Sequence, residues 1–173
     1  MSCLLIHDEI RMSSEIQNPN SATNTAQVLR RFRVVFNAVR SHFLQIEKQV
    51  ALGGAQVWAL SVIKANPGIG MGKLAKNMDI HQSTTSNLVK TLLRKELISL
   101  TKLPEDRRNV QLHVLPAGLM VLAQVPGPFE GVLPGALDRL PPSTLLRLDQ
   151  DLATLIALLK ADEQAGGIPL SEL

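Results

Sequence analysis

Cysteine, tyrosine and long apolar runs are scarce or missing in this chain of 173 residues. Its single cysteine, Cys3, excludes an intramolecular disulfide and a cysteine-based zinc cluster. The four histidines lie apart without a second ligand at metal spacing, so we expect neither a metal nor a cofactor. Apolar runs stay below the roughly 18 residues of a membrane span, and residues 1–6 lack the basic start of a signal peptide. We therefore expect a soluble cytoplasmic protein without a membrane partner.

Aromatic residues make up only 3% of the chain, whereas 45% of the residues are apolar. Leucine, valine and alanine dominate, and this balance favours helices packed on helices over a β-sandwich. The sequence also lacks a cluster of nucleophile, base and orienting carboxylate, and it lacks a phosphate-binding glycine loop. We expect a mostly α-helical protein that is not an enzyme.

The net charge of +3 is unevenly distributed along the chain. Residues 64–113 contain nine lysines and arginines against four aspartates and glutamates, a balance of +5, so the remainder carries −2. A basic central segment is the electrostatic signature of a polyanionic partner.

Turn residues, apolar periodicity and helix breakers divide the chain into four segments. Residues 1–21 are turn-prone and without periodicity, which predicts a mobile N-terminal extension. Residues 22–52 are predicted to form one dimerisation helix, and residues 129–165 are predicted to form C-terminal dimerisation helices. Between them, residues 54–125 are predicted to form a DNA-binding region.

Both terminal segments carry apolar residues at alternating spacings of three and four. The last helix is predicted to start near Pro142 and to end at the Gly-Gly-Ile-Pro stretch of residues 166–169. Dimer contacts are predicted at Leu29, Phe32, Phe36, Leu148, Leu152 and Leu155. Each seam needs a partner helix along its length, and a monomer would struggle to cover both. An obligate two-fold homodimer is therefore expected.

Residues 71–78, a turn at 79–81 and a helix from 82 to about 95 give a helix-turn-helix pattern. Apolar periodicity directs one face of the helix from residue 82 inward. Its polar face holds the candidate DNA contacts Gln82, Ser83, Thr84, Ser86, Asn87 and Lys90. Gln82 and Asn87 are candidates for adenine edges, because an amide can pair with N6 and N7. Ser83, Thr84 and Ser86 suit phosphates or a thymine methyl, and Lys90 suits a phosphate. A solvated polar helix face is the competing interpretation.

Two strand-like runs, residues 97–102 and 109–115, flank a charged tip that contains Arg107 and Arg108. A hairpin beside a helix-turn-helix is a wing, and a wing that reaches the DNA backbone or minor groove needs arginine. Pro116 is predicted to start a further helix, which the Pro-Gly-Pro run of residues 126–128 interrupts near residue 125.

From about residue 27 to 160 the chain resembles the MarR family of winged helix-turn-helix regulators. The resemblance rests on Leu74-Ala75, Ile80, Ser83-Thr84, Leu88-Val89, Leu92, Gly118 and above all Asp106-Arg107-Arg108, which matches the D-x-R pattern of the family wing. It implies a homodimeric repressor that binds a pseudo-palindromic operator in double-stranded DNA and is released by a small phenolic or other aromatic ligand. It further implies that Arg108 reaches the minor groove or its phosphates, and that Asp106 orients an arginine of the wing.

The chain departs from the family pattern at three places. Leu115-Pro116 replaces the usual cap before Gly118, and the Pro-Gly-Pro run of residues 126–128 breaks a helix that is commonly continuous. Glu96 stands where a glycine usually ends the recognition helix, so we expect that helix end to be built differently.

Two alternative functions compete with a ligand-responsive repressor. A winged helix can serve as a protein-interaction module with weak DNA affinity, although the polar recognition helix and basic wing argue against this. Cys3 could sense oxidants, but it precedes the first predicted helix by about twenty residues and has no nearby basic residue to lower its pKa.

Overall fold

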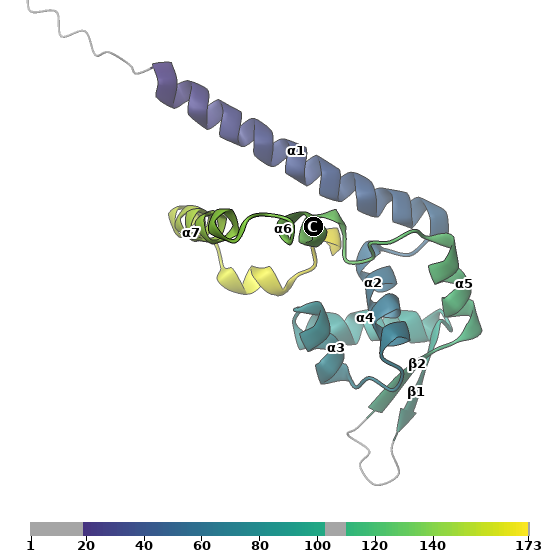
Figure 1. Cartoon of the computed structure of the whole chain (residues 1–173). Helices are drawn as coiled ribbons and strands as arrows, with labels where there is room; N and C mark the ends of the chain where they lie inside the picture. Colours follow the sequence, from purple (N-terminus) through teal and green to yellow (C-terminus); the bar gives the residue numbers. More distant parts are fainter. Residues whose placement is uncertain (1–18, 103–109, 173) are drawn as a thin grey trace, which may run out of the picture. The chain divides into compact units, whose positions relative to one another are not determined.

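The computed structural model describes residues 19–102 and 110–172, with side chains from residue 25 onward (Figure 1). The chain divides into two compact units, residues 1–35 and 36–173. The first unit contributes the N-terminal part of helix α1 (Pro19–Val50), and all other elements belong to the second unit. Within the described ranges, no helix combines the length and apolarity needed to cross a bilayer.

Three helices, a two-stranded hairpin and a fourth helix follow α1 in the second unit (Figure 1). Their bounds are α2 (Gly54–Ala65), α3 (Met71–Met78), α4 (Gln82–Arg94), β1 (Ile98–Lys102), β2 (Val110–Val114) and α5 (Pro116–Gln124). The strands pair antiparallel, with Ile98 opposite Val114 and Lys102 opposite Val110. The fold is thus mostly helical with one small hairpin, in the order of a winged helix-turn-helix, as the sequence predicts.

Helix α2 is the centre of the core, because its apolar residues are buried on more than one side. Val57, Leu60 and Ile63 are completely buried, and the helix packs against α3, α4, α5 and β2. Leu74, Leu92 and Leu112 supply the facing side chains from α3, α4 and β2. Burial of each such side chain contributes about 1.5–3 kcal/mol, so the core fixes the position of α4 relative to the hairpin.

Helix α5 starts at Pro116 and packs closely on the base of the hairpin. A Cβ atom at Gly118 would collide with the carbonyl oxygen of Leu97 and would lie 2.8 Å from Val114 Cγ1. The Leu115 N–H donates to the same Leu97 oxygen at 2.9 Å. Only glycine fits where α5 passes the base of the hairpin. The helix ends at Gln124, before the Pro-Gly-Pro run, as predicted.

The end of α4 shows that the expectation for Glu96 is wrong. Glu96 adopts the left-handed conformation with φ 55°, the place that a glycine would take. Its N–H donates to the oxygen of Leu93 at 3.0 Å, and the N–H of Leu97 donates to that of Leu92 at 3.0 Å. These two bonds form an ordinary Schellman motif, so buried Leu97 and the paired carbonyls compensate for the missing glycine.

The chain after α5 continues through α6 (Val132–Leu137), α7 (Pro142–Leu159) and two short 3₁₀ turns, η1 (Glu163–Gly167) and η2 (Leu170–Glu172). The predicted end of the last helix at residues 166–169 is wrong, because α7 ends at Leu159. Lys160 is left-handed with φ 52°, and the Asp162 carboxylate accepts the N–H of Gln164 at 3.0 Å. That capping bond starts a new turn in place of further helix.

Candidate nucleic-acid interface

The N-terminal half of α4 presents the predicted polar residues at the surface. Thr85, Leu88, Val89 and Leu92 are buried, which turns the opposite face outward. Four of the candidate contacts are exposed: Gln82, Ser83, Asn87 and Lys90. The other two, Thr84 and Ser86, are half-buried. The fold therefore gathers all six on one surface, and their contact with DNA stays a prediction.

Hydrogen bonds within the first turns of α4 refine this set. The Ser86 hydroxyl donates to the oxygen of Gln82 at 2.9 Å, so its proton is used inside the helix. Thr85 is completely buried, and its hydroxyl donates to the oxygen of His81 at 3.1 Å. The N-cap residue His81 makes no side-chain cap, and the first turn of α4 contains no acidic residue. The N–H groups at this helix end can therefore donate to an anion.

The helices and strands that form this surface carry charge of one sign, whereas the neighbouring turn η1, whose Gln164 oxygen lies 2.6 Å from His81 Nε2, adds Glu163 and follows Asp162. Helices α3 and α4 and strands β1 and β2 contain five basic residues and no acidic residue; the five are Lys73, Lys76, Lys90, Arg94 and Lys102. The acidic residues that the structure describes between residues 71 and 114 are Asp79 and Glu96, which lie in the turns that follow α3 and α4. A surface of this kind attracts a polyanion and repels acidic proteins.

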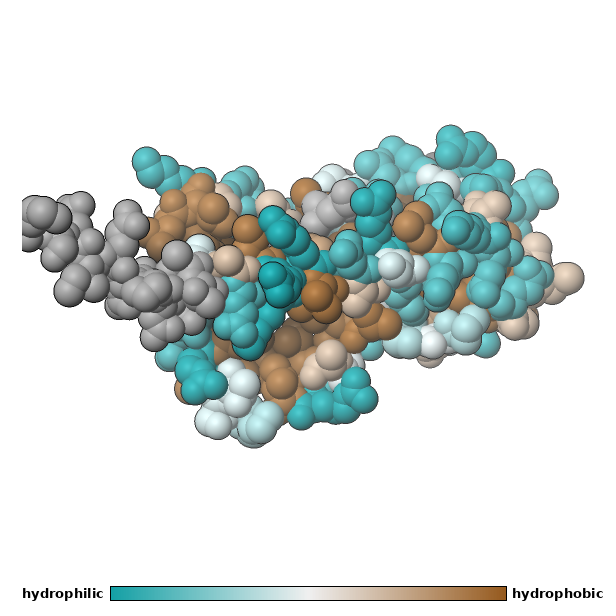
Figure 2. All heavy atoms as spheres, turned by 90° about the horizontal axis from the view of Figure 1, so that it is seen from above, coloured by the Kyte–Doolittle hydropathy of each residue, from teal (hydrophilic) through white to brown (hydrophobic). Residues whose placement is uncertain are grey.

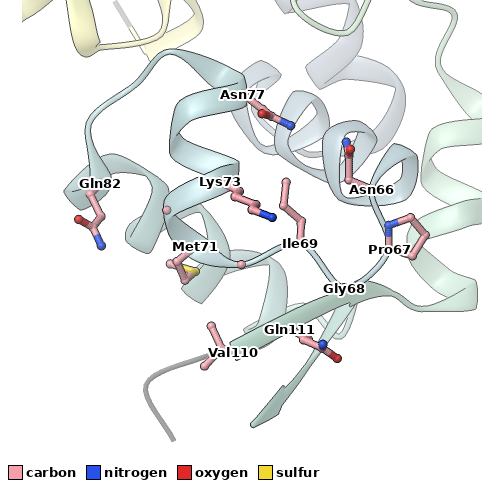
Figure 3. Close-up of a pocket in the computed structure, with 12 residues that line it drawn as sticks. Asn66, Pro67, Gly68, Ile69, Met71, Lys73, Asn77, Gln82, Val110 and Gln111 are labelled. Atoms are coloured by element: carbon pink, nitrogen blue, oxygen red, sulfur yellow. The ribbon is translucent and has the colours of Figure 1, made fainter. Parts of the chain in front are cut away.

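A groove of about 980 Å³ lies beside the tip end of β2, between this strand, α3 and the start of α4 (Figure 3). We call it the hairpin groove. Its lining residues are Asn66, Pro67, Gly68, Ile69, Gly70, Met71, Gly72, Lys73, Asn77, Gln82, Val110 and Gln111. The lining contains one basic and no acidic side chain, and it reaches the recognition helix at Gln82. A sugar-phosphate backbone passing the helix is the ligand that this chemistry suits.

Lys73, Asn77 and Gln111 are candidate contacts that the sequence did not single out. They lie on α3 and β2 and come together only because Gly68 and Ile69 pair with Leu112 of the hairpin. Lys73 contributed to the basic balance of the segment, which was the only available signal. These three residues can be recognised as neighbours only in the folded protein, because α3 and β2 are far apart in the sequence.

The predicted wing contacts Asp106, Arg107 and Arg108 lie outside the described residues. The strands that lead to them are described, and Lys102 and Val110 form the last pair of the ladder. Cys3, the candidate redox residue, also lies outside the described part of the chain.

A second, more apolar cavity of about 460 Å³ lies in the second unit and opens to solvent, and we call it the internal cavity. Val39 and Phe43 of α1 and Trp58 of α2 form one part of its wall, and the C-terminal segment, residues 162–172, contributes another. Asp79 and Glu130 also line it, and the lining contains no lysine, arginine or histidine. A small aromatic molecule of neutral or positive charge suits such a wall better than an anion.

Two histidines of the described chain make hydrogen bonds to distant main-chain carbonyls. His42 Nε2 lies 2.9 Å from the oxygen of Pro128, and His81 Nε2 lies 2.6 Å from the oxygen of Gln164. In the part of the chain that the structure describes, no three metal-binding side chains come close enough to hold an ion.

Comparison with known proteins locates the sequence match on the same region. The model of the MarR family matches residues 55–110. A candidate transcriptional regulatory protein for the hcr operon of Thauera aromatica is 39% identical over 66 residues, which are 38% of this chain and 40% of that protein. The HTH-type transcriptional regulator YsmB of Bacillus subtilis is 26% identical over a match that covers 59% of this chain and 70% of the YsmB chain. This chain thus spans less than half the length of the Thauera protein.

Solved structures share the fold at low sequence identity. The S. aureus MepR-DNA complex superposes with a TM-score of 0.53 at 18% identity, over 74% of this chain and 95% of that one. A candidate MarR-like transcription regulator from Bacillus cereus gives a TM-score of 0.51 at 18% identity, over 79% and 99%. The order of helices and the hairpin match these structures, so the chain has the winged helix-turn-helix fold, and its residues 55–110 match the MarR family.

Proposed function

We infer that this protein is a homodimeric transcriptional repressor that binds a pseudo-palindromic operator in double-stranded DNA. The observation that carries the proposal is the surface of α3, α4 and the hairpin, which is basic and free of acidic residues within the described helices and strands. Helix α4 enters the major groove by its N-terminal half, where short polar side chains face outward.

The side chains on this surface contact different parts of the DNA according to their chemistry. Gln82 and Asn87 read adenine edges, since their amides can both donate and accept. Ser83, Thr84 and Ser86 contact phosphates or a thymine methyl, and Ser86 acts as an acceptor because its proton is bound to the helix. Lys90 and Lys73 neutralise phosphates on the two sides of α4. Arg107 and Arg108 extend these contacts at the wing, with Asp106 orienting one arginine.

A second copy of the chain covers the apolar residues of α7. No residue of α7 is buried, although the helix carries Leu145, Leu146, Leu152, Ile156, Leu158 and Leu159 as exposed apolar side chains. Figure 2 shows that hydrophobic side chains are exposed among hydrophilic ones on this face of the molecule. Leu148, Leu152 and Leu155 of α7 and Leu29, Phe32 and Phe36 of α1 supply the dimer contacts. A two-fold dimer then places two recognition helices about one turn of DNA apart.

The internal cavity holds the ligand that releases the operator. Its volume of about 460 Å³ lies within the usual range of about 300–1,000 Å³ for small-molecule sites. Trp58 and Phe43 offer aromatic faces, and Asp79 and Glu130 offer negative charge. A neutral phenol or an aromatic cation is therefore the preferred ligand class, and a phenolic carboxylate is disfavoured.

Selection of duplexes from a random-sequence pool tests the proposal, followed by titration of the selected duplex at several salt concentrations. Binding should be specific, should fall steeply with salt, and should weaken in the Gln82→Ala/Asn87→Ala variant. Gln150→Ala, an exposed polar residue on α7, is the matched control and should bind as the wild type does. Failure to enrich any sequence, or affinity indifferent to salt, would favour a protein-interaction module instead.

A further inference from the structure

The C-terminal segment, residues 162–172, touches the residue from which the recognition helix starts. His81 is the N-cap of α4, and its main-chain N–H donates to the oxygen of Gly167 at 3.1 Å. Its ring nitrogen Nε2 lies 2.6 Å from the oxygen of Gln164. Since a carbonyl oxygen can only accept, Nε2 carries the proton and donates. Two hydrogen bonds from one residue thus join segments more than eighty positions apart.

The contact between Gly167 and the His81 ring leaves no room for a side chain while the ring keeps its hydrogen bond to Gln164. A Cβ atom built at Gly167 would lie 2.6 to 2.8 Å from the His81 ring atoms Nε2, Cδ2 and Cε1. The neighbouring Gly166 has no atom within 4 Å of such a Cβ. Close approach to His81 therefore explains why residue 167 is glycine. No such contact requires a glycine at residue 166.

The C-terminal segment is held in shape at both ends. At its start the Asp162 carboxylate accepts the N–H of Gln164 at 3.0 Å. Towards its end Pro169 is buried and η2 packs on α2, where a Cβ atom at Gly54 would lie 2.9 Å from Ser171 Cβ. The segment thus spans from the start of α2 to the start of α4, both of which belong to the winged helix-turn-helix.

The internal cavity is lined by the sequence neighbours of both partners of this contact. Gly166, Ile168 and Pro169 of the C-terminal segment line it, and so do Asp79 and Ile80, which directly precede His81. The cavity wall therefore includes the residues on either side of Gly167 and the turn that leads to His81.

We propose that residues 162–172 act as a clasp that positions the recognition helix through His81. The inference rests on the proposed DNA-binding function for its consequence, but the contact itself can be measured without DNA. His81 is a positioning residue in this scheme, because it acts through α4.

The test examines Gly167→Ala by hydrogen exchange, in comparison with Gly166→Ala, and by DNA binding. The methyl group at residue 167 should push the segment away, so the amide of residue 81 and the first turn of α4 should exchange faster. The lost hydrogen bonds should lower the affinity for a duplex selected by the wild type about two- to tenfold, because fewer molecules hold α4 in the binding position. Gly166→Ala should match the wild type in exchange. Because Gly166 also lines the internal cavity, the control for DNA binding is Gly135→Ala, which lies outside that lining and has no atom within 4 Å of the new Cβ.

A double variant separates positioning from damage to the fold. In His81→Ala/Gly167→Ala the ring is gone, so the methyl group fits and the main-chain bond from residue 81 to residue 167 can form again. Protection of the residue 81 amide should then recover towards the wild-type value. A chain that ends after Ala161 should behave as Gly167→Ala does.

Three results would overturn the proposal. One is equal exchange in Gly167→Ala and Gly166→Ala; another is faster exchange with unchanged DNA affinity; the third is a double variant that stays unprotected. If the wild type selects no duplex, the proposed function fails, while the exchange measurements still decide whether the clasp exists.

Discussion

Replacement of Lys73 or Lys90 by glutamine should make DNA binding less sensitive to salt. Both lysines are exposed on the surface of α3, α4 and the hairpin, where the described helices and strands contain no acidic residue to compete for them. Each phosphate that a protein neutralises contributes about −0.9 to the slope of log affinity against log salt. In a homodimer one substitution removes two contacts, so the slope should become less negative by about 1.8.

The size of this effect is within reach of fluorescence anisotropy. Between about 50 and about 200 mM salt the logarithm of concentration rises by about 0.6, so a slope change of about 1.8 alters the loss of affinity about tenfold. The duplex is one selected by the wild-type protein. Lys48→Gln is the matched control, because Lys48 is an exposed lysine in the last turn of α1, outside this surface.

Two results would refute this reasoning. If Lys73→Gln and Lys90→Gln keep the wild-type slope, the basic surface does not face phosphates. If Lys48→Gln changes the slope as much as they do, the effect is one of net charge alone. A change of about 0.9 would mean one protomer per duplex and would contradict the homodimer.

Four further substitutions test other parts of the proposal. Asn87→Ala should change the preferred base at one position of each half-site, and an unchanged profile in a repeated selection would contradict its role. Arg108→Ala should weaken binding by about 1–3 kcal/mol in the same titration, whereas equal affinity would remove the wing from the interface. Gly118→Ala should destabilise the fold by about 1–3 kcal/mol and lower the melting temperature, while the control Gly135→Ala, with no atom within 4 Å of the new Cβ, should not. Leu152→Glu should leave the helix content intact and produce monomers in sedimentation experiments, because a charge would be buried at the dimer contact; a persistent dimer would place the interface elsewhere.

Local physical chemistry makes much of this fold predictable from the sequence. Apolar residues at helical spacing locate α4, and its predicted end at about residue 95 differs by one residue from the observed end at Arg94. Alternation at period two locates β2, and Pro116 marks the start of α5. These signals depend on neighbours within a few residues, so a linear sequence contains them.

Features that depend on contacts between distant segments could not be predicted in this way. The Gly166-Gly167 pair is a stronger helix-stop signal in sequence than Lys160, yet α7 ends at Leu159 because Lys160 turns left-handed and Asp162 caps a new turn. The hairpin groove joins α3 to β2, and its contacts at Lys73 and Gln111 follow from the pairing of two separate segments. The same holds for His81, whose partner carbonyls lie near the other end of the chain.

The position of the C-terminal segment also decides how the protein should be handled in the laboratory. A purification tag or a fluorescent reporter joined after Leu173 would be attached only six residues after Gly167, which contacts the start of α4. Such a fusion would load the contact between η2 and α2 that anchors the segment, and a loosened anchor would change the affinity measured with the tagged protein. A tag placed before residue 19 avoids this segment, so affinities measured with the two arrangements should differ.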